Sequence, residues 1–334
     1  HLRIPGIVLL LGAGVALGPD GVGIVVPEIL GPALDALIGF AVAVILFDGG
    51  LNLNIRRIRG QAPVIQRLLS LGVVITTAGA AVAAHLLLGW SWTPALLFGT
   101  LVIVTGPTVI TPLLRRIRVR RNVETILETE GVLIDAVGAV VAVVALEIAL
   151  GDPLTSGAIS VSTRLVAGLL AGAVGGATMA VLLRLPWAVP EGHETIFTLA
   201  LTLAVYQVSN ALAPESGIMA AISAGIVVGN AGARSEREIK EFKEQLTTML
   251  IGLLFVLLAA DVRVVDVAAV GKAGVLVVVV LMFLVRPLNI MVCTAGAGLT
   301  WKEKAFLSWV APRGIVAAAV ASLFAERLSA IGAD

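Results

Sequence analysis

Two carboxylates lie inside an apolar segment of this sequence. Glu130 and Asp135 occur within TILETEGVLIDAVGAVV, residues 125–141. Side chains five positions apart project about 140° apart around a helix, so the two acids can have different roles. Acids within an apolar membrane span are costly and mark functional candidates. One carboxylate can form a fixed ion pair, while the other can face an aqueous cavity and titrate.

Two further apolar segments are interrupted near their middle. Residues 92–114 contain VTGPTVI, with Gly106 and Pro107, and residues 303–325 contain VAPRGIV, with Pro312, Arg313 and Gly314. Proline removes a backbone donor and glycine weakens a helix, so both segments are expected to break. Half-helix ends at mid-membrane can hold ions, and a buried arginine there needs an anionic partner. A kink without function is the alternative for either site taken alone.

The elements that carry these groups are expected to be membrane-spanning helices. Of the 334 residues, 58% are hydrophobic and 13% are charged, whereas soluble domains contain roughly 25% charged residues. A helix needs about 20 apolar residues to cross the hydrocarbon core. We identify eleven candidate spans, at residues 4–18, 33–54, 62–88, 92–114, 122–150, 160–184, 194–212, 215–231, 244–262, 268–292 and 303–325. The sequence therefore predicts an all-α polytopic membrane protein.

Basic residues concentrate in alternate connections between the spans. These connections contain Arg56, Arg57, Arg59, Arg67, Arg115, Arg116, Arg118, Arg120, Arg121, Arg184, Arg234, Arg237, Lys240, Lys243, Lys302 and Lys304. The positive-inside rule places these connections in the cytoplasm. For RRIRVRR, a cytoplasmic loop beside anionic lipid is a better interpretation than a nucleic-acid site. The single cysteine, Cys293, excludes an internal disulfide and a Cys-rich metal site.

A weak internal repeat relates the two halves of the chain. ILFDGGL at 45–51 resembles LLFVLLAADV at 253–262, and SWTPALLFGTLVIVTGP at 91–107 resembles TWKEKAFLSWVAPRG at 300–314. The two pairs have nearly equal offsets and are related by an odd number of spans, so the copies have opposite topology. Inverted repeats are typical of secondary transporters. Chance similarity among Gly-, Ala- and Leu-rich helices is the alternative.

Four motifs together give this chain a resemblance to the monovalent cation/proton antiporter superfamily, in its sodium/proton exchanger-like branch. They are LFDGGLNLN, TGPTVITPLLRR, ETEGVLIDAVGAVV and APRGIVAAAVASLF, and they occur in the family's order. The resemblance implies an antiporter fold with inverted repeats and two broken crossing helices. The family has thirteen helices, so the first and last are expected to be missing from this chain.

The resemblance also implies a division of the chain. Residues 1–150 would form the first repeat, with core helices at 62–150, and residues 160–184 would form the linking helix. Residues 194–334 would form the second repeat. A dimerisation part is expected from residues 4–54 and 194–262, which implies a homodimer.

The resemblance assigns roles to particular residues. Asp135 matches the essential Asp that carries the proton and then a monovalent cation. Glu130 matches a Glu that pairs with the Arg of the second broken helix, here Arg313. Asp48 matches an acidic position that helps to line the site, and Thr105 matches a Thr whose oxygen atoms can coordinate the ion.

The sequence departs from the family pattern at two positions. The usual TDP at the first break is TGP here, so Gly106 removes a carboxylate ligand. The usual polar neighbour of the essential Asp is Ile134, which disfavours the charged form of Asp135 by desolvation. Fewer oxygen ligands would favour the less strongly hydrated K⁺ or shift the working pH. Asp48 or Thr108 could partly substitute.

The leading hypothesis is therefore secondary antiport of Na⁺ or K⁺ against H⁺ by alternating access, with a role in pH homeostasis. Because Asp135 has no second acid beside it, exchange is expected to be electroneutral. A cation channel or regulated K⁺ efflux pathway on the same scaffold is the alternative. A solute symporter would need more polar residues within its spans, and no motif indicates an enzyme. We expect no cofactor and no nucleic-acid partner.

The expected location is a lipid bilayer, in the bacterial inner membrane. A cytoplasmic regulatory domain beyond Asp334 is a further possibility that the sequence leaves open.

Overall fold

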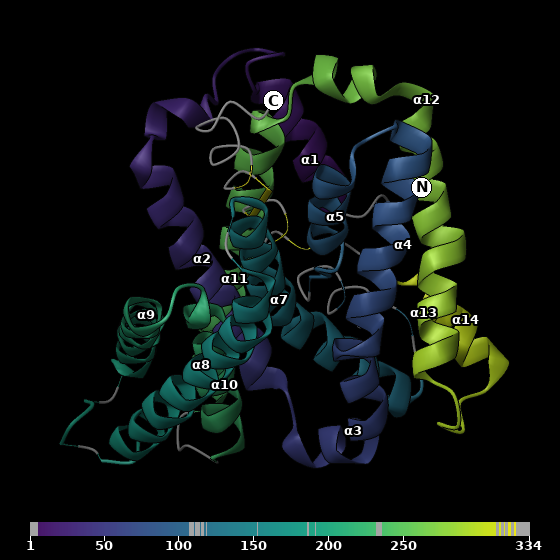
Figure 1. Cartoon of the computed structure of the whole chain (residues 1–334). Coiled ribbons are helices and arrows are strands. Elements are labelled where there is room, and N and C mark those ends of the chain that lie inside the picture. Colours follow the sequence, from purple (N-terminus) through teal and green to yellow (C-terminus); the bar gives the residue numbers. More distant parts are fainter. Residues whose placement is uncertain are drawn as a thin grey trace.

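The computed structural model describes residues 6–106, 110, 114, 117, 119–151, 153–185, 187–190, 192–231, 236–311, 314, 317, 320, 321 and 324 (Figure 1). Its elements are η1 (Pro27–Leu30), η2 (Leu281–Val285) and the helices α1 (Gly6–Leu17), α2 (Pro32–Asn52), α3 (Ile55–Leu69), α4 (Leu71–Leu88), α5 (Trp92–Leu101), α7 (Arg121–Ala149), α8 (Leu154–Leu182), α9 (Glu194–Leu212), α10 (Ser216–Asn230), α11 (Glu236–Asp261), α12 (Val264–Val280), α13 (Arg286–Cys293) and α14 (Trp301–Trp309). A helix lies in each of the eleven expected spans, and the described residues form no strand.

Several helices are long and apolar enough to cross a membrane. Within the described ranges they are Ile55–Leu88, Arg121–Ala149, Ile159–Leu182, Glu194–Leu212 and Val264–Cys293. Shorter apolar helices cover Val8–Leu17, Ala36–Asn52, Ser216–Asn230 and Gln245–Asp261. Large apolar side chains such as Val265 and Val275 are exposed along α12, and Phe283 is exposed in η2, which follows it. Such a surface suits a lipid environment, as the sequence predicts.

In both spans that were expected to be interrupted, the regular α-helix ends before the expected break. α5 stops at Leu101 and the chain is irregular from Val104 to Gly106. α14 stops at Trp309, and Val310 has an extended backbone conformation. Pro107 and Pro312, two of the four expected break residues, lie outside the described residues.

Two spans differ in detail from their expected form. Residues 55–61, expected as a connection, are the first turns of α3, because the Asn54 side chain accepts hydrogen bonds from the N–H groups of Arg56 and Arg57. The expected span 268–292 is not one regular helix. Gly271 bends α12 with a φ of 57°, and the π-helical η2 leads into Arg286. Pro287 follows at once and has no N–H for the preceding turn.

Glycines bring α2, α8 and α10 into close contact. On α8 they recur every fourth residue, as Gly168, Gly172 and Gly176, and a Cβ on Gly172 would lie 2.2 Å from the carbonyl oxygen of Ala220 on α10. On the other side of α10, a Cβ on Gly225 would lie 2.2 Å from the carbonyl oxygen of Phe47 on α2. Helices in lipid gain stability from such close packing, because hydrophobicity does not favour their association.

α7 lies at the centre of the molecule and positions both acids of the TILETEGVLIDAVGAVV segment (Figure 1). It contacts α2, α8 and α10 on one side and α3, α5 and α14 on the other. Its side chains are buried along most of its length, from Val123 to Leu146. The absence of a Cβ at Gly138 admits the side chain of Val104, so the irregular chain after α5 runs directly against α7.

The glycine packing predicts the effect of a single methyl group. Gly172→Ala places its Cβ within 3 Å of α10 backbone, so we expect it to destabilise the protein by about 1–3 kcal/mol. Gly60→Ala is the matched control, since nothing lies within 4 Å of its Cβ on α3. Thermal unfolding in detergent measures both. Equal midpoints for the two variants would contradict the proposed packing.

Candidate cation site

The two interrupted spans meet beside Asp135. Asp135 is 2% exposed on α7. A Cβ added to Gly314 would lie 2.7 Å from the Cα of Gly106 and 3.2 Å from Asp135 Oδ1. The structure therefore brings positions 106, 135 and 314 together, and only glycine at position 314 permits this approach without a shift of the neighbouring backbone.

Two buried oxygen atoms in this region have no hydrogen-bond partner within the described parts of the chain. They are Asp135 Oδ1 and the hydroxyl oxygen of Thr105, which is adjacent to Gly106. Buried polar groups are nearly always paired, so unpaired ones call for an explanation. A carboxylate and hydroxyl oxygens are the ligands that hard cations prefer, and the carboxylate can alternatively hold a proton. The arrangement is suited to either ligand.

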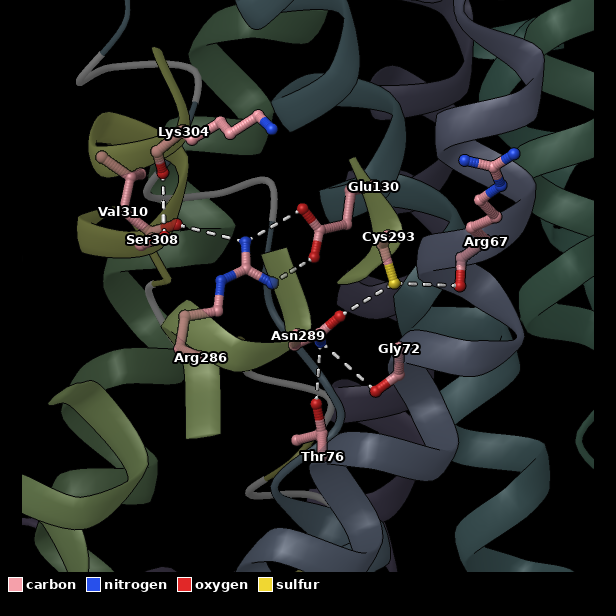
Figure 2. Close-up of polar contacts among 10 residues, drawn as sticks. All are labelled: Arg67, Gly72, Thr76, Glu130, Arg286, Asn289, Cys293, Lys304, Ser308 and Val310. Atoms are coloured by element: carbon pink, nitrogen blue, oxygen red, sulfur yellow. Dashed lines mark hydrogen bonds and ion pairs between the residues drawn. The ribbon is translucent and has the colours of Figure 1, made fainter. Parts of the chain in front are cut away.

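Glu130 forms a buried ion pair with Arg286 (Figure 2). Arg286 Nη1 donates to Oε1 at 2.5 Å and Nη2 donates to Oε2 at 3.0 Å. Nη2 also donates to the carbonyl of Val310 at 3.4 Å, which links the pair to the end of α14. Glu130 is 4% exposed and Arg286 is 7% exposed. The pair joins three elements directly beside the second interruption.

Arg286 was not predicted as this partner from the sequence. Arginines near the end of a span often extend to water, whereas the side chain of Arg286 is buried. The partner expected for Glu130, Arg313, lies outside the described residues, as does Thr108. A Glu130–Arg313 contact stays a prediction. The signal for Arg286 was an arginine followed by proline within an otherwise apolar span.

Asp48 lies one turn before the end of α2. Its backbone carbonyl accepts a hydrogen bond from Asn52 Nδ2 at 2.9 Å, and its Oδ1 accepts a longer one at 3.5 Å. Its neighbours Leu46 and Phe47 pack in the same core cluster as Val132 and Ala136 of α7. α2 thus contacts the helix that carries Asp135, and a role of Asp48 in lining the site stays a prediction.

A second group of buried charges lies towards the other end of α7. Arg164 on α8 donates from Nη2 to both carboxylate oxygens of Glu147 at 2.8 Å. Glu215, which precedes α10, has a left-handed backbone with φ of 62°. Burial raises the pKa of the Glu215 carboxyl above its ordinary value; Arg164 opposes this rise and Glu147 adds to it. Arg164 was not predicted as a functional residue from the sequence, although it lies well inside span 160–184, whose other arginine, Arg184, is the last residue of the span.

The Glu130–Arg286 pair predicts strong coupling between the two residues. Glu130→Gln or Arg286→Met alone leaves an uncompensated buried charge, so we expect each to cost about 3–5 kcal/mol of unfolding free energy. The double variant should cost clearly less than the sum, because no charge is left without its partner. Thermal unfolding of the four proteins measures the coupling. A second double-mutant cycle, of Glu130→Gln with Arg313→Met, serves as the comparison. If Glu130 were coupled to Arg313 and not to Arg286, the ion pair described here would be refuted.

Known proteins resemble this chain over nearly its whole length. It is 26% identical to sodium/hydrogen exchanger 7 of Arabidopsis thaliana, over 95% of this chain and 30% of that protein. It is 27% identical to the K(+)/H(+) antiporter NhaP2 of Shewanella oneidensis, over 95% of this chain and 55% of that protein. The chain thus spans about half or less of these two relatives. Na(+)/H(+) antiporter 1 of Methanocaldococcus jannaschii is 26% identical over 96% of this chain and 77% of its own length.

A solved structure shares the fold. The sodium proton antiporter MjNhaP1 from Methanocaldococcus jannaschii superimposes with a TM-score of 0.85 at 23% identity, covering 99% of this chain and 84% of that one. The antiporter fold expected from the sequence is thereby confirmed. The relatives named here are transporters and not enzymes. The family described as "Sodium/hydrogen exchanger, transmembrane" matches residues 1–332, and this chain is a multi-pass membrane protein that belongs to that family.

Proposed function

We propose that this protein exchanges a monovalent cation, Na⁺ or K⁺, for H⁺ across a membrane, with Asp135 as the group that carries either ion. The observation that supports this most directly is the buried Asp135 carboxylate, whose Oδ1 has no hydrogen-bond partner in the described chain and lies at the meeting of two interrupted spans. Relatives named as Na⁺/H⁺ and K⁺/H⁺ antiporters support the same activity.

Competition for one carboxylate gives a simple mechanism. An ionised acid within a membrane is costly, so Asp135 is stable when a proton or a cation neutralises it. The two ligands exclude each other, because the carboxylate that binds the cation must be deprotonated. Glu130 does not take part in this exchange, since Arg286 already neutralises it. Alternating access then presents one neutral site to each side in turn.

The cation ligands proposed around Asp135 are Thr105, Asp48 and Thr108. Thr105 is buried beside Gly106 and its hydroxyl has no partner in the described part of the molecule. Gly106 supplies no carboxylate, so the proposed site has one carboxylate fewer than the family pattern. The weaker electrostatic field of such a site favours K⁺ over Na⁺ more than the family pattern would.

The proposed division of labour follows the expected repeats. α7 belongs to the moving core with the other helices of residues 62–150, and α8 is the linking helix. The glycine contacts of α10 with α2 and α8 are consistent with a stiff supporting part, formed from residues 4–54 and 194–262. We propose that this part mediates a homodimer.

Exchange measured in proteoliposomes tests the site. With a pH-sensitive dye inside, Li⁺, Na⁺, K⁺ or Rb⁺ added outside should drive proton movement in the wild type, and Asp135→Asn should abolish it because the amide holds no proton. Asp266→Asn is the matched control, since Asp266 is exposed at the start of α12. Normal exchange by Asp135→Asn would show that another group carries the ions. Cation flux without proton movement would indicate a channel instead.

The stoichiometry is a separate expectation. One titrating carboxylate per site should exchange one cation for one proton, so the exchange rate should not change when a membrane potential is imposed. Solid-supported membrane recordings at symmetric pH under a cation gradient measure this. A sustained current that depends on Asp135 would refute electroneutral exchange while leaving antiport intact.

A further inference from the structure

A small polar cavity lies between the Glu130–Arg286 pair and the first interruption. The side chains that matter in its lining are Thr76, Thr105, Glu130, Ile134, Arg286 and Asn289. They come from α4, α7, α13 and the irregular chain after α5. About 20 Å³ is open to the centre of a water molecule. This is enough for one water, which needs about 10–15 Å³ by the same measure.

Two buried polar atoms of the lining residues lack partners. Arg286 Nε and Thr105 Oγ1 have none among the residues that the structure describes. Asn289 also lines the cavity, and its Nδ2 donates to Thr76 Oγ1 at 3.0 Å and to the Gly72 carbonyl at 3.3 Å (Figure 2). Thr76 Oγ1 thus accepts from Asn289 and keeps its second lone pair for another donor.

The charges in the wall decide what can occupy this cavity. Arg286 offers an N–H, so the occupant must accept a hydrogen bond. A cation cannot do so and would be repelled by the guanidinium. Glu130, the one carboxylate among the described lining residues, already accepts from Arg286 through both oxygens. An anion would add a second negative charge beside Glu130. A neutral acceptor of the size of water fits both the charge and the volume.

We propose that this cavity holds one ordered water molecule, which accepts hydrogen bonds from Arg286 Nε and from the hydroxyl of Thr105. Once its hydrogen points to this water, Thr105 Oγ1 directs its lone pairs away from the cavity and towards a cation at Asp135. Thr76 and Asn289 act as positioning residues, because Thr76 accepts a hydrogen bond from the water and Asn289 in turn holds the Thr76 hydroxyl. The second half of this proposal rests on the proposed function, whereas the water itself does not.

The cavity also explains how an isoleucine is accommodated beside Asp135. Ile134 is 4% exposed and forms part of the same wall. Its side chain offers no acceptor to Arg286 Nε, and the water supplies one. An asparagine at position 134 would bring an amide oxygen to the same cavity and could replace the water.

The first experiment tests for the water by measuring thermal stability. It compares asparagine substitutions at two isoleucines of α7. In Ile134→Asn the amide enters a polar cavity, so we expect a thermal midpoint within about 2 °C of the wild type. In Ile126→Asn, the matched control, the amide enters an apolar cluster at a fully buried position, and the midpoint should fall by roughly 5 °C or more. If the thermal midpoint fell equally in both variants, the proposed water would be refuted.

The second experiment tests the effect on Thr105. Thr76→Val keeps the shape of the side chain but removes one partner of the water, so the KM for the cation should rise by roughly three- to tenfold. The kcat should stay within about twofold, since Asp135 is unchanged. Thr76→Ser should restore the KM, and Thr77→Val, one residue away and outside the cavity lining, should leave it unaltered. An unchanged KM in Thr76→Val would overturn the link to Thr105.

The two experiments separate the two claims. If the wild type itself exchanged no cation in proteoliposomes, the proposed function would fail, but the comparison of Ile134→Asn with Ile126→Asn would still decide whether the cavity holds water. A cryo-EM map that resolves waters elsewhere in the core gives the same decision directly: density between Arg286 Nε and Thr105 Oγ1 is expected, and its absence would refute the proposal.

Discussion

The cost of placing charge in a low-dielectric interior constrains this molecule throughout. Three of the five acids on α7, Glu130, Asp135 and Glu147, meet this cost in two different ways. Glu130 is neutralised by Arg286 and Glu147 by Arg164, both through carboxylate–guanidinium hydrogen bonds. Asp135, between them in sequence, has a carboxylate oxygen without such a bond in the described chain. This contrast, a fixed pair on each side and one unpaired oxygen between them, is the basis for proposing Asp135 as the exchangeable acid.

Close backbone approach is the second requirement, and it determines where the acids can lie. Gly314 permits the second interrupted span to reach both Gly106 and Asp135, and Gly138 permits α7 to pack against Val104. Both contacts converge on the same part of α7. The Glu130–Arg286 pair adds an electrostatic link to this region, because Arg286 also contacts the carbonyl of Val310, which directly follows α14. Packing and charge pairing therefore both hold the second interrupted span close to α7.

The Glu130–Arg286 pair also connects the fixed charges to the proposed cation site. Arg286 uses both terminal nitrogens on Glu130 and directs Nε elsewhere. Arg286 also lines the cavity that includes Thr105, which is adjacent to Gly106. A guanidinium that neutralises one acid can in this way orient a hydroxyl near another. The loss of a polar residue at position 134 is then compatible with an ordered site, because the polarity is provided by α4 and α13.

The sequence by itself determined the membrane class, the helical spans, the interruptions and the two acids, since each depends on local composition and on the types of neighbouring residues. Its motifs also indicated the family, which the comparisons confirm. It did not determine which basic residue meets which acid: Arg286 is far from Glu130 in the chain and Arg164 lies on a different helix from Glu147. An arginine in an apolar span can reach water or turn inward. Only the packing of α7 against α8, α13 and α14 decided between these orientations, because burial and partner distance are properties of the assembled helices.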